Sequence, residues 1–335
     1  MLYPVQTLPQ STPHKQKGKV KKKPAEVVIS KRAQEILEAI HTYRFVTAWD
    51  ITRLFYSPTS INHVRELLSL LSGKNDYQDR TYLYRFPLPT TRIGNTEKIY
   101  TLGSRGRAYL HSCGMDIDWY FRPYKFQFTD DVMTYYQPCL HALTLTRFLV
   151  ASQVFGKKSQ EWELTTMRTE YALKKEIAEE KAKQQAVTIA IKPDKGSEEE
   201  QVTVIPDAWL LFHQRTGKKG SWHPVFLEID RGTEQQKHFK RQIRARAVFL
   251  ANGGYKKLFG TNKGVIAYAT TGNQTRMNTM RVWTQQVLAE LNVKKLSSRF
   301  LFCSLTPSWE QDEKSLFLAP MWFRASDKHA VPLLA

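Results

Sequence analysis

The sequence has few cysteines and no long apolar run. Cys113, Cys139 and Cys303 show neither CxxC spacing nor a histidine at metal-ligand spacing, which argues against a zinc site or a disulfide framework. No apolar run approaches the roughly 18 residues that a membrane-spanning helix needs. No apolar signal segment follows Met1. We therefore expect a cytoplasmic protein in a reducing environment, without membrane attachment.

Several enzyme signatures are also missing. The sequence contains no GxxxxGK[ST] phosphate loop, no GxSxG and no HExxH. Tyr135 and Tyr136 lack the histidine triad that accompanies a nucleophilic tyrosine in tyrosine relaxases. These absences argue against a Walker-type NTPase and against a covalent tyrosyl intermediate.

Positive charge is what the chain has in excess. Its 50 Lys and Arg residues outnumber 31 Asp and Glu, which gives a formal net charge of +19. A hydrophobic fraction of 41% excludes general disorder, and 335 residues suffice for two domains. The charge predicts a nucleic-acid partner, double-stranded DNA or alternatively single-stranded DNA, although solubility alone is the simpler explanation.

The most basic stretch is the N-terminal segment. Residues 1–26 show no apolar periodicity and carry a lysine run that includes Lys21, Lys22 and Lys23 between prolines. Such a run repels itself and is disordered in isolation. We interpret it as an arm that lies along DNA phosphates, with a solubilising tail as the alternative.

Residues 27–112 predict a winged helix-turn-helix. Ser30 can cap a helix over 31–43, a second helix is expected from Phe45 to Phe55, and Thr59 or Ser60 can cap a third that ends near Leu71. Two strands, 82–86 and 98–102, enclose a polar turn and form the wing. The predicted DNA contacts are Asn62, His63 and Arg65 on the third helix and Arg92 in the wing turn.

The rest of the chain is expected to be a connector followed by an α/β domain with a mixed central sheet, so the fold class is α+β and multidomain. Residues 113–135 are rich in aromatic side chains, which we interpret as domain packing, with a base-stacking platform as the alternative. The domain over 136–335 should contain a helix at 140–155, a strand or strand–helix junction at 162–173, a charged surface excursion at 174–200, a basic helix at 234–250, a strand at 264–269, a helix at 273–291 and a strand at 299–305.

Two apolar runs that end in acids are the most informative feature. Residues 202–207 end in Pro206-Asp207, and residues 224–230 end in Glu228-Ile229-Asp230. A glycine- and lysine-rich turn joins them, so we expect an antiparallel pair with three carboxylates at one rim of a sheet. Buried carboxylates need a compensating partner. Oxygen ligands suit a hard cation such as Mg²⁺ or Mn²⁺.

The order of these elements resembles the PD-(D/E)xK nuclease core. The run 225–234 further resembles the signature of the replication-relaxation family of plasmids and integrative elements. Segments 44–47, 100–103, 168–170, 270–273 and 319–322 agree with that family. The resemblance implies a restriction-endonuclease-like domain and a relaxase-like activity that nicks one DNA strand at the start of conjugative transfer. A homodimer or partner proteins from the same element are further expectations.

The resemblance also implies roles for individual residues. Asp207 and Glu228 would be the core metal ligands, with Asp230 as a third ligand or a supporting carboxylate. Glu170 would be an auxiliary acid. His141 would orient water or phosphate, or alternatively would be a capping or packing residue at the start of the helix that it opens. Arg231 and Thr233 lie beside the acids in the sequence and could bind phosphate.

One departure from the nuclease pattern affects the expected activity. The place of the motif lysine, two residues after Glu228, holds Asp230. Related families carry this lysine on the following helix, where Gln242 stands in this chain. The candidates to replace it are Lys237, Lys240 and Arg241, which could equally form a phosphate-binding face. Two functions follow: a metal-dependent DNA nickase, or a catalytically inactive DNA-binding regulator of replication or transcription.

Overall fold

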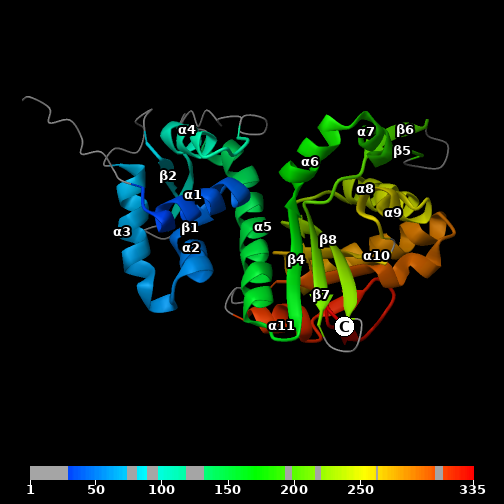
Figure 1. The fold of residues 1–335 in the computed structure, drawn as a ribbon. Helices are drawn as coiled ribbons and strands as arrows, with labels where there is room; N and C mark the ends of the chain where they lie inside the picture. Colours follow the sequence, from blue (N-terminus) through cyan, green and yellow to red (C-terminus); the bar gives the residue numbers. More distant parts are fainter. Residues whose placement is uncertain are drawn as a thin grey trace, which may run out of the picture.

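The computed structural model describes residues 29–73, 81–88, 97–117, 132–192, 198–215, 220–261, 263–305 and 312–335. It shows an α+β protein around a mixed seven-stranded sheet (Figure 1). The predicted arm with Lys21, Lys22 and Lys23, the wing turn with Arg92 and most of the aromatic connector lie outside the described residues. None of the helices within these ranges is both long and apolar enough to cross a membrane.

Three helices open the described chain. Helix α1 (Lys31–Tyr43) begins where predicted because Ser30 Oγ accepts a hydrogen bond from Ala33 N at 3.2 Å. Helix α2 (Ala48–Phe55) begins later than predicted, since Thr47 and Asp50 form a capping box at its start. A 3₁₀ turn (Pro58–Ser60) leads into α3 (Ile61–Ser72), which ends at Gly73 with a φ of +73°.

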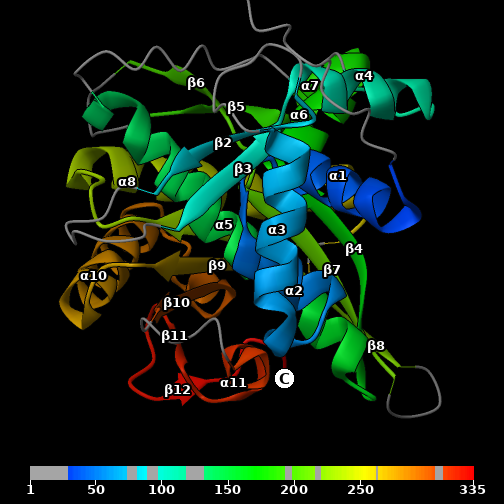
Figure 2. The same cartoon turned by 90° about the vertical axis from the view of Figure 1, so that its left-hand side faces the viewer.

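A small antiparallel sheet packs beside these helices (Figure 2). Its strands are β1 (Val46–Thr47), β2 (Leu83–Pro87) and β3 (Lys98–Leu102), in the order β1-β3-β2. Helix α4 (Ser104–Ser112) follows β3. The two predicted wing strands are therefore confirmed as a paired hairpin.

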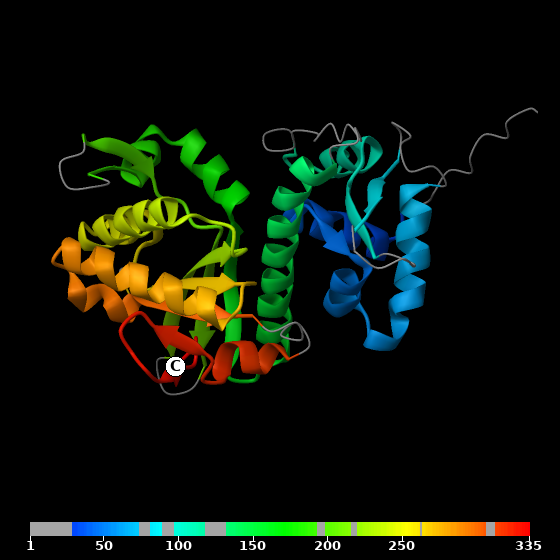
Figure 3. The same cartoon turned by 180° about the vertical axis from the view of Figure 1, so that it is seen from behind.

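Helix α5 (Val132–Lys158) is longer than the predicted helix and lies between this first part and the large sheet (Figure 3). On one side, Thr146 Oγ1 donates to the carbonyl oxygen of Tyr43 at 3.1 Å. On the other, the Phe148 ring contacts Phe317 and Trp322. One hydrophobic core therefore runs from α1 through α5 to the C-terminal residues.

The large sheet has the order β12-β11-β10-β9-β8-β7-β4. Strands β8, β9 and β10 are parallel, and the other neighbours are antiparallel. Helices α5 and α11 cover one face, while α8, α9 and α10 cover the other with a second core. The bounds are β4 (Trp162–Thr169), β7 (Ala208–Gln214), β8 (Ser221–Asp230), β9 (Val265–Thr270), β10 (Phe300–Ser304), β11 (Trp322–Arg324), β12 (Ala330–Val331), α8 (Gln236–Ala251), α9 (Gly254–Phe259), α10 (Gln274–Glu290) and α11 (Glu313–Leu318), with a 3₁₀ turn at Lys294–Arg299.

The charged stretch over 174–200, predicted as a surface excursion, is folded, and most of its described side chains are exposed or half-buried. The structure has α6 (Glu170–Glu179), α7 (Lys181–Val187) and a hairpin of β5 (Thr188–Ile191) and β6 (Glu200–Thr203). Charged side chains dominate this stretch, but Ile177 and other apolar residues are buried in one core with residues of α8, α9 and α10. A sparse apolar face is enough to dock a short helix when a larger core lies beneath it.

The first of the two acid-bearing strands also differs from the prediction. Val202 belongs to β6, which pairs with β5 rather than with the strand that carries Glu228. Pro206 lies between β6 and β7, where its missing N–H group is tolerated. Asp207 therefore precedes β7, and the antiparallel hairpin consists of β7 and β8.

Candidate functional site

A cleft of about 580 Å³ opens where β7 begins and β8 ends. Residues from α5, α6 and α8 form its walls. It brings together eight of the residues singled out in the sequence: His141, Glu170, Asp207, Glu228, Asp230, Arg231, Thr233 and Gln242.

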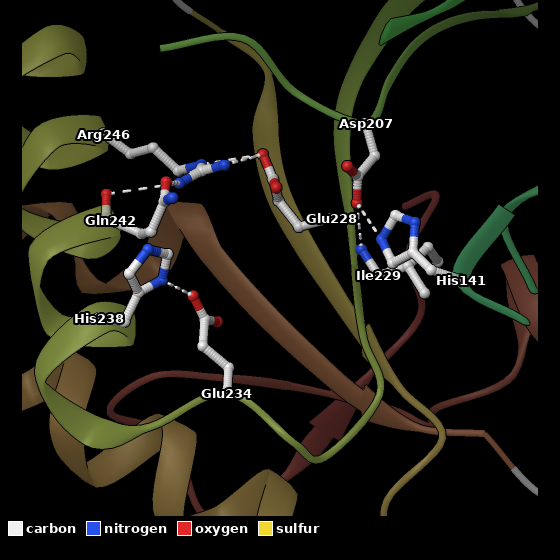
Figure 4. Close-up of polar contacts among 8 residues, drawn as sticks. All are labelled: His141, Asp207, Glu228, Ile229, Glu234, His238, Gln242 and Arg246. Carbon is white, nitrogen blue, oxygen red and sulfur yellow. Dashed lines mark hydrogen bonds and ion pairs between the residues drawn. The ribbon is translucent and has the colours of Figure 1, made fainter. Parts of the chain in front are cut away.

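Asp207 is anchored through one carboxylate oxygen. Its Oδ2 accepts a hydrogen bond from Ile229 N at 2.8 Å and lies 3.2 Å from His141 Nε2 (Figure 4). Its backbone carbonyl accepts a hydrogen bond from Glu170 N at 2.7 Å. The described residues provide no hydrogen bond to Oδ1, so this oxygen is available to a ligand.

His141 lies inside α5 rather than at its start, because α5 already begins at Val132. The alternative role as a helix cap is therefore wrong. Burial lowers the pKa of His141, but the hydrogen bond to Asp207 and the negative charges of Asp207 and Glu170 outweigh that effect and raise the pKa. The raised pKa favours the protonated imidazole, in which Nε2 donates to Asp207 Oδ2.

Glu228 lies on β8, beside the start of β7, and its side chain is nearly buried. Its Oε1 accepts two hydrogen bonds from Arg246, from Nε at 2.8 Å and from Nη2 at 2.6 Å. Its Oε2 has no hydrogen-bond partner among the described residues. Burial, together with the charges of Asp207 and Glu170, raises the pKa of Glu228 to about 8, against the lowering effect of Arg246.

Arg246 is a residue of the cleft that the sequence did not predict. It lies four residues after Gln242, so both project from one face of α8, and its Nη1 donates to Gln242 Oε1. Figure 4 shows its guanidinium between Gln242 and Glu228. The sequence gave no hint of it, because α8 carries several other basic residues. Lys237 is exposed and Lys240, Arg241 and Arg244 are half-buried, whereas Arg246 is buried.

Asp230 has both carboxylate oxygens engaged. Arg276 donates to it from Nη2 at 2.8 Å and from Nε at 3.1 Å. Thr270 Oγ1 donates at 2.6 Å and Gly232 N at 2.9 Å. Asp230 thereby joins the ends of β8 and β9 to α10, and it offers no free oxygen to a metal in this arrangement.

The metal-binding prediction depends on which oxygens remain available. Within the described ranges, no three His, Cys, Asp or Glu side chains are grouped closely enough to hold a metal ion. Asp207 and Glu228 nevertheless line one cleft, each with one oxygen free of hydrogen bonds. Mg²⁺ usually takes one or two protein carboxylates and completes its shell with water or phosphate, so these two residues fit it without Asp230.

The other predicted residues are more dispersed. Lys237 is exposed, Lys240 is not part of the cleft wall, and Arg241 forms an ion pair with Glu200 at 2.6 Å. Glu170 lines the cleft and pairs with Lys174. Arg231 and Thr233 lie in the loop between β8 and α8, at the mouth of the cleft.

The predicted DNA-binding residues of α3 lie on its exposed face. Asn62, His63 and Arg65 are exposed, while Val64 and Leu68 are buried. Arg65 Nη1 donates to Asn62 Oδ1 at 3.2 Å, which orients both side chains outward. Helix α3 and the strands β7 and β8 lie on opposite sides of α5 (Figure 1).

Comparison with known proteins gives one match. The family model described as replication-relaxation matches residues 37–265, a range that runs from α1 to the start of β9 and includes Asp207, Glu228 and Arg246. No curated protein and no solved structure matches the chain.

Proposed function

The chain belongs to the replication-relaxation family, and on that premise we propose that it is a DNA-binding protein of a plasmid or other mobile element that nicks DNA in the cleft. The reaction is hydrolysis of one phosphodiester bond with Mg²⁺ or Mn²⁺. The observation that carries the proposal is the pair of carboxylates, Asp207 and Glu228, on adjoining strand ends with one free oxygen each.

The architecture supports a division of labour within this proposal. Three helices with a β-hairpin suit a winged helix-turn-helix, in which α3 enters the major groove. The β4-β7-β8 meander followed by α8 and the parallel strand β9 suits a PD-(D/E)xK nuclease-like domain. The first part would find the DNA site, and the cleft would act on the strand.

The residues of the cleft would have two roles: two carboxylates would bind the metal ion, and their neighbours would hold those carboxylates in place. Asp207 Oδ1 and Glu228 Oε2 would hold the ion, which when bound lowers the pKa of water and neutralises charge on the phosphate. The Ile229 amide and His141 fix the orientation of Asp207. Arg246 fixes Glu228 in the same way, so neither carboxylate has to reorganise for binding.

A specific observation favours the alternative, a catalytically inactive DNA-binding regulator. Arg246 already compensates the charge of Glu228, and no lysine stands two residues after Glu228. In that case the ion pair would stabilise the fold and metal would have no role in function.

A nicking assay on supercoiled plasmid distinguishes the two. The plasmid should carry the DNA that flanks the gene, and the reaction should be run with and without Mg²⁺ or Mn²⁺. We expect open circles with the wild type and none with Asp207→Asn. Glu163→Gln is the matched control. Glu163 lies at the start of β4, whereas the cleft residue Glu170 follows the end of that strand, and Glu163 pairs with Arg215.

The outcomes separate cleanly. Metal-dependent nicking that survives in Glu163→Gln and is lost in Asp207→Asn supports the nickase. Retarded but uncut plasmid with all three proteins supports the regulator. Nicking that persists in Asp207→Asn would contradict the assignment of the cleft.

A further inference from the structure

The hydroxyl of Tyr268 is a buried polar group without a partner. Tyr268 lies on β9, directly opposite Glu228 in the parallel register, and its side chain is 4% exposed. No described residue forms a hydrogen bond with its oxygen. A buried hydroxyl that makes no hydrogen bond is destabilising, so such a group calls for an explanation.

The position of this hydroxyl is fixed by the packing of its ring. The Tyr268 ring stacks on Phe302, with centroids 5.3 Å apart, and meets Phe239 edge-on at 5.5 Å. These contacts hold the ring from the sheet and from α8. The hydroxyl therefore cannot turn away to find a partner elsewhere.

Tyr268 lines the cleft beside Arg246. The guanidinium carbon of Arg246 lies 5.9 Å from the centre of the Tyr268 ring. Arg246 uses Nε and Nη2 on Glu228 and Nη1 on Gln242, which leaves the second N–H of Nη2 without an acceptor among the described residues. Two residues with an unused donor, one charged and one neutral, thus line the same cleft as the carboxylates.

We propose that Arg246 and Tyr268 form an anion subsite that takes a non-bridging oxygen of the DNA phosphodiester. The inference rests on the proposed function and adds to it the groups that bind the scissile phosphate. Arg246 would supply the positive charge that the motif lysine would otherwise provide.

Charge balance supports this assignment. A bound divalent cation favours the ionised form of both carboxylates. With His141 neutral, that cation and the Arg246 guanidinium then neutralise Asp207, Glu228 and one phosphodiester. The other acids of the cleft already have partners: Glu170 pairs with Lys174, Asp230 with Arg276, and Glu234 with His238. A neutral phenol adds a hydrogen bond to the phosphate without disturbing that balance.

The test is the substitution Tyr268→Phe, which removes one oxygen and keeps the ring packing. We expect the variant to be at least as stable as the wild type in thermal unfolding, because the lost hydroxyl has no partner. Its nicking rate should fall at least about tenfold, the factor that corresponds to about 1.4 kcal/mol. Inorganic phosphate should raise the melting temperature of the wild type more than that of the variant.

Tyr43→Phe is the matched control. Tyr43 is also a buried tyrosine, but its hydroxyl donates to Gln153 Oε1 on α5, outside the cleft wall. This variant should lose stability and keep the wild-type nicking rate and phosphate response. The two variants should therefore show opposite patterns.

The result also separates this inference from the proposed function. If the wild type nicks and Tyr268→Phe nicks equally well with the same phosphate response, the anion subsite is refuted and the nickase stands. If the wild type does not nick, the proposed function fails, and the phosphate response alone decides the subsite. Arg246→Lys, which keeps the charge and loses the planar fork, should weaken both readouts.

Discussion

The ion pair between Asp230 and Arg276 leads to a quantitative prediction about stability. Both side chains are largely buried, with 3% and 14% exposed, and the N–O distance is 2.8 Å. Arg276→Met would leave the Asp230 carboxylate buried without its counter-charge. We expect the free energy of unfolding to fall by about 3–5 kcal/mol, the usual cost of removing one partner of a buried pair.

The assay is equilibrium unfolding in urea at neutral pH, with the slope m checked for constancy. The control is Arg324→Met, which removes the partner of Asp327 from an ion pair of similar length, 3.0 Å, that is 42% and 36% exposed. That change should cost less than about 1 kcal/mol. Adding Asp230→Asn to Arg276→Met should recover part of the loss, because the Asn oxygen can still accept from Thr270 and Gly232.

The reasoning would be refuted by a loss of less than about 1 kcal/mol in Arg276→Met, within the range of an exposed pair. Asp230 would then depend little on Arg276. Its carboxylate would be free to serve as the third metal ligand that the sequence predicted.

Three further predictions concern the cleft and the first part of the chain. The pKa of Glu228 is raised to about 8 from 4.5, so its contribution to stability is complete below pH 4.5 and is lost as the pH rises to about 8. The stability of the wild type relative to Glu228→Gln should therefore fall across that window in urea titrations, and a constant difference would contradict the raised pKa. Thr47→Ala removes the capping box of α2 and should cost about 1 kcal/mol, measured by thermal unfolding; no change would mean that packing alone fixes the helix start. Arg65→Ala should leave stability unchanged and reduce the salt slope of DNA binding by about 1 in anisotropy titrations, whereas an unchanged slope would place α3 away from phosphate.

The parts of the fold that the sequence predicted well are those set by local chemistry. The bounds of α1 follow from the Ser30 cap and apolar periodicity, and α3 ends at Gly73, as the sequence suggests. The strand β3 was predicted with its observed bounds because alternating apolar residues follow a turn. In these cases the information lies within a few neighbouring residues.

The parts that escaped prediction depend on distant contacts. Asp207 and Glu228 were found because acids beside apolar strands stand out in the sequence. The role of Asp230 was not, since Arg276 reaches it from 46 residues away. Arg246 looks like any other basic residue of α8, and only the position of Glu228 on β8 distinguishes it. The ion-pair partner of a charged residue depends on which distant segments the fold brings together, so it cannot be predicted from the neighbouring sequence.

Helix α5 sets a fixed distance between the first part of the chain and the large sheet. Its 27 residues span about 40 Å, and one hydrophobic core joins it to the first part of the chain and to the large sheet. The distance between α3 and the cleft is therefore set by packing rather than by a linker. Under the proposed function, in which α3 recognises one DNA segment and the cleft cuts another, this packing fixes the number of base pairs between them. Moving the recognised sequence along the DNA would then move the nick by the same amount.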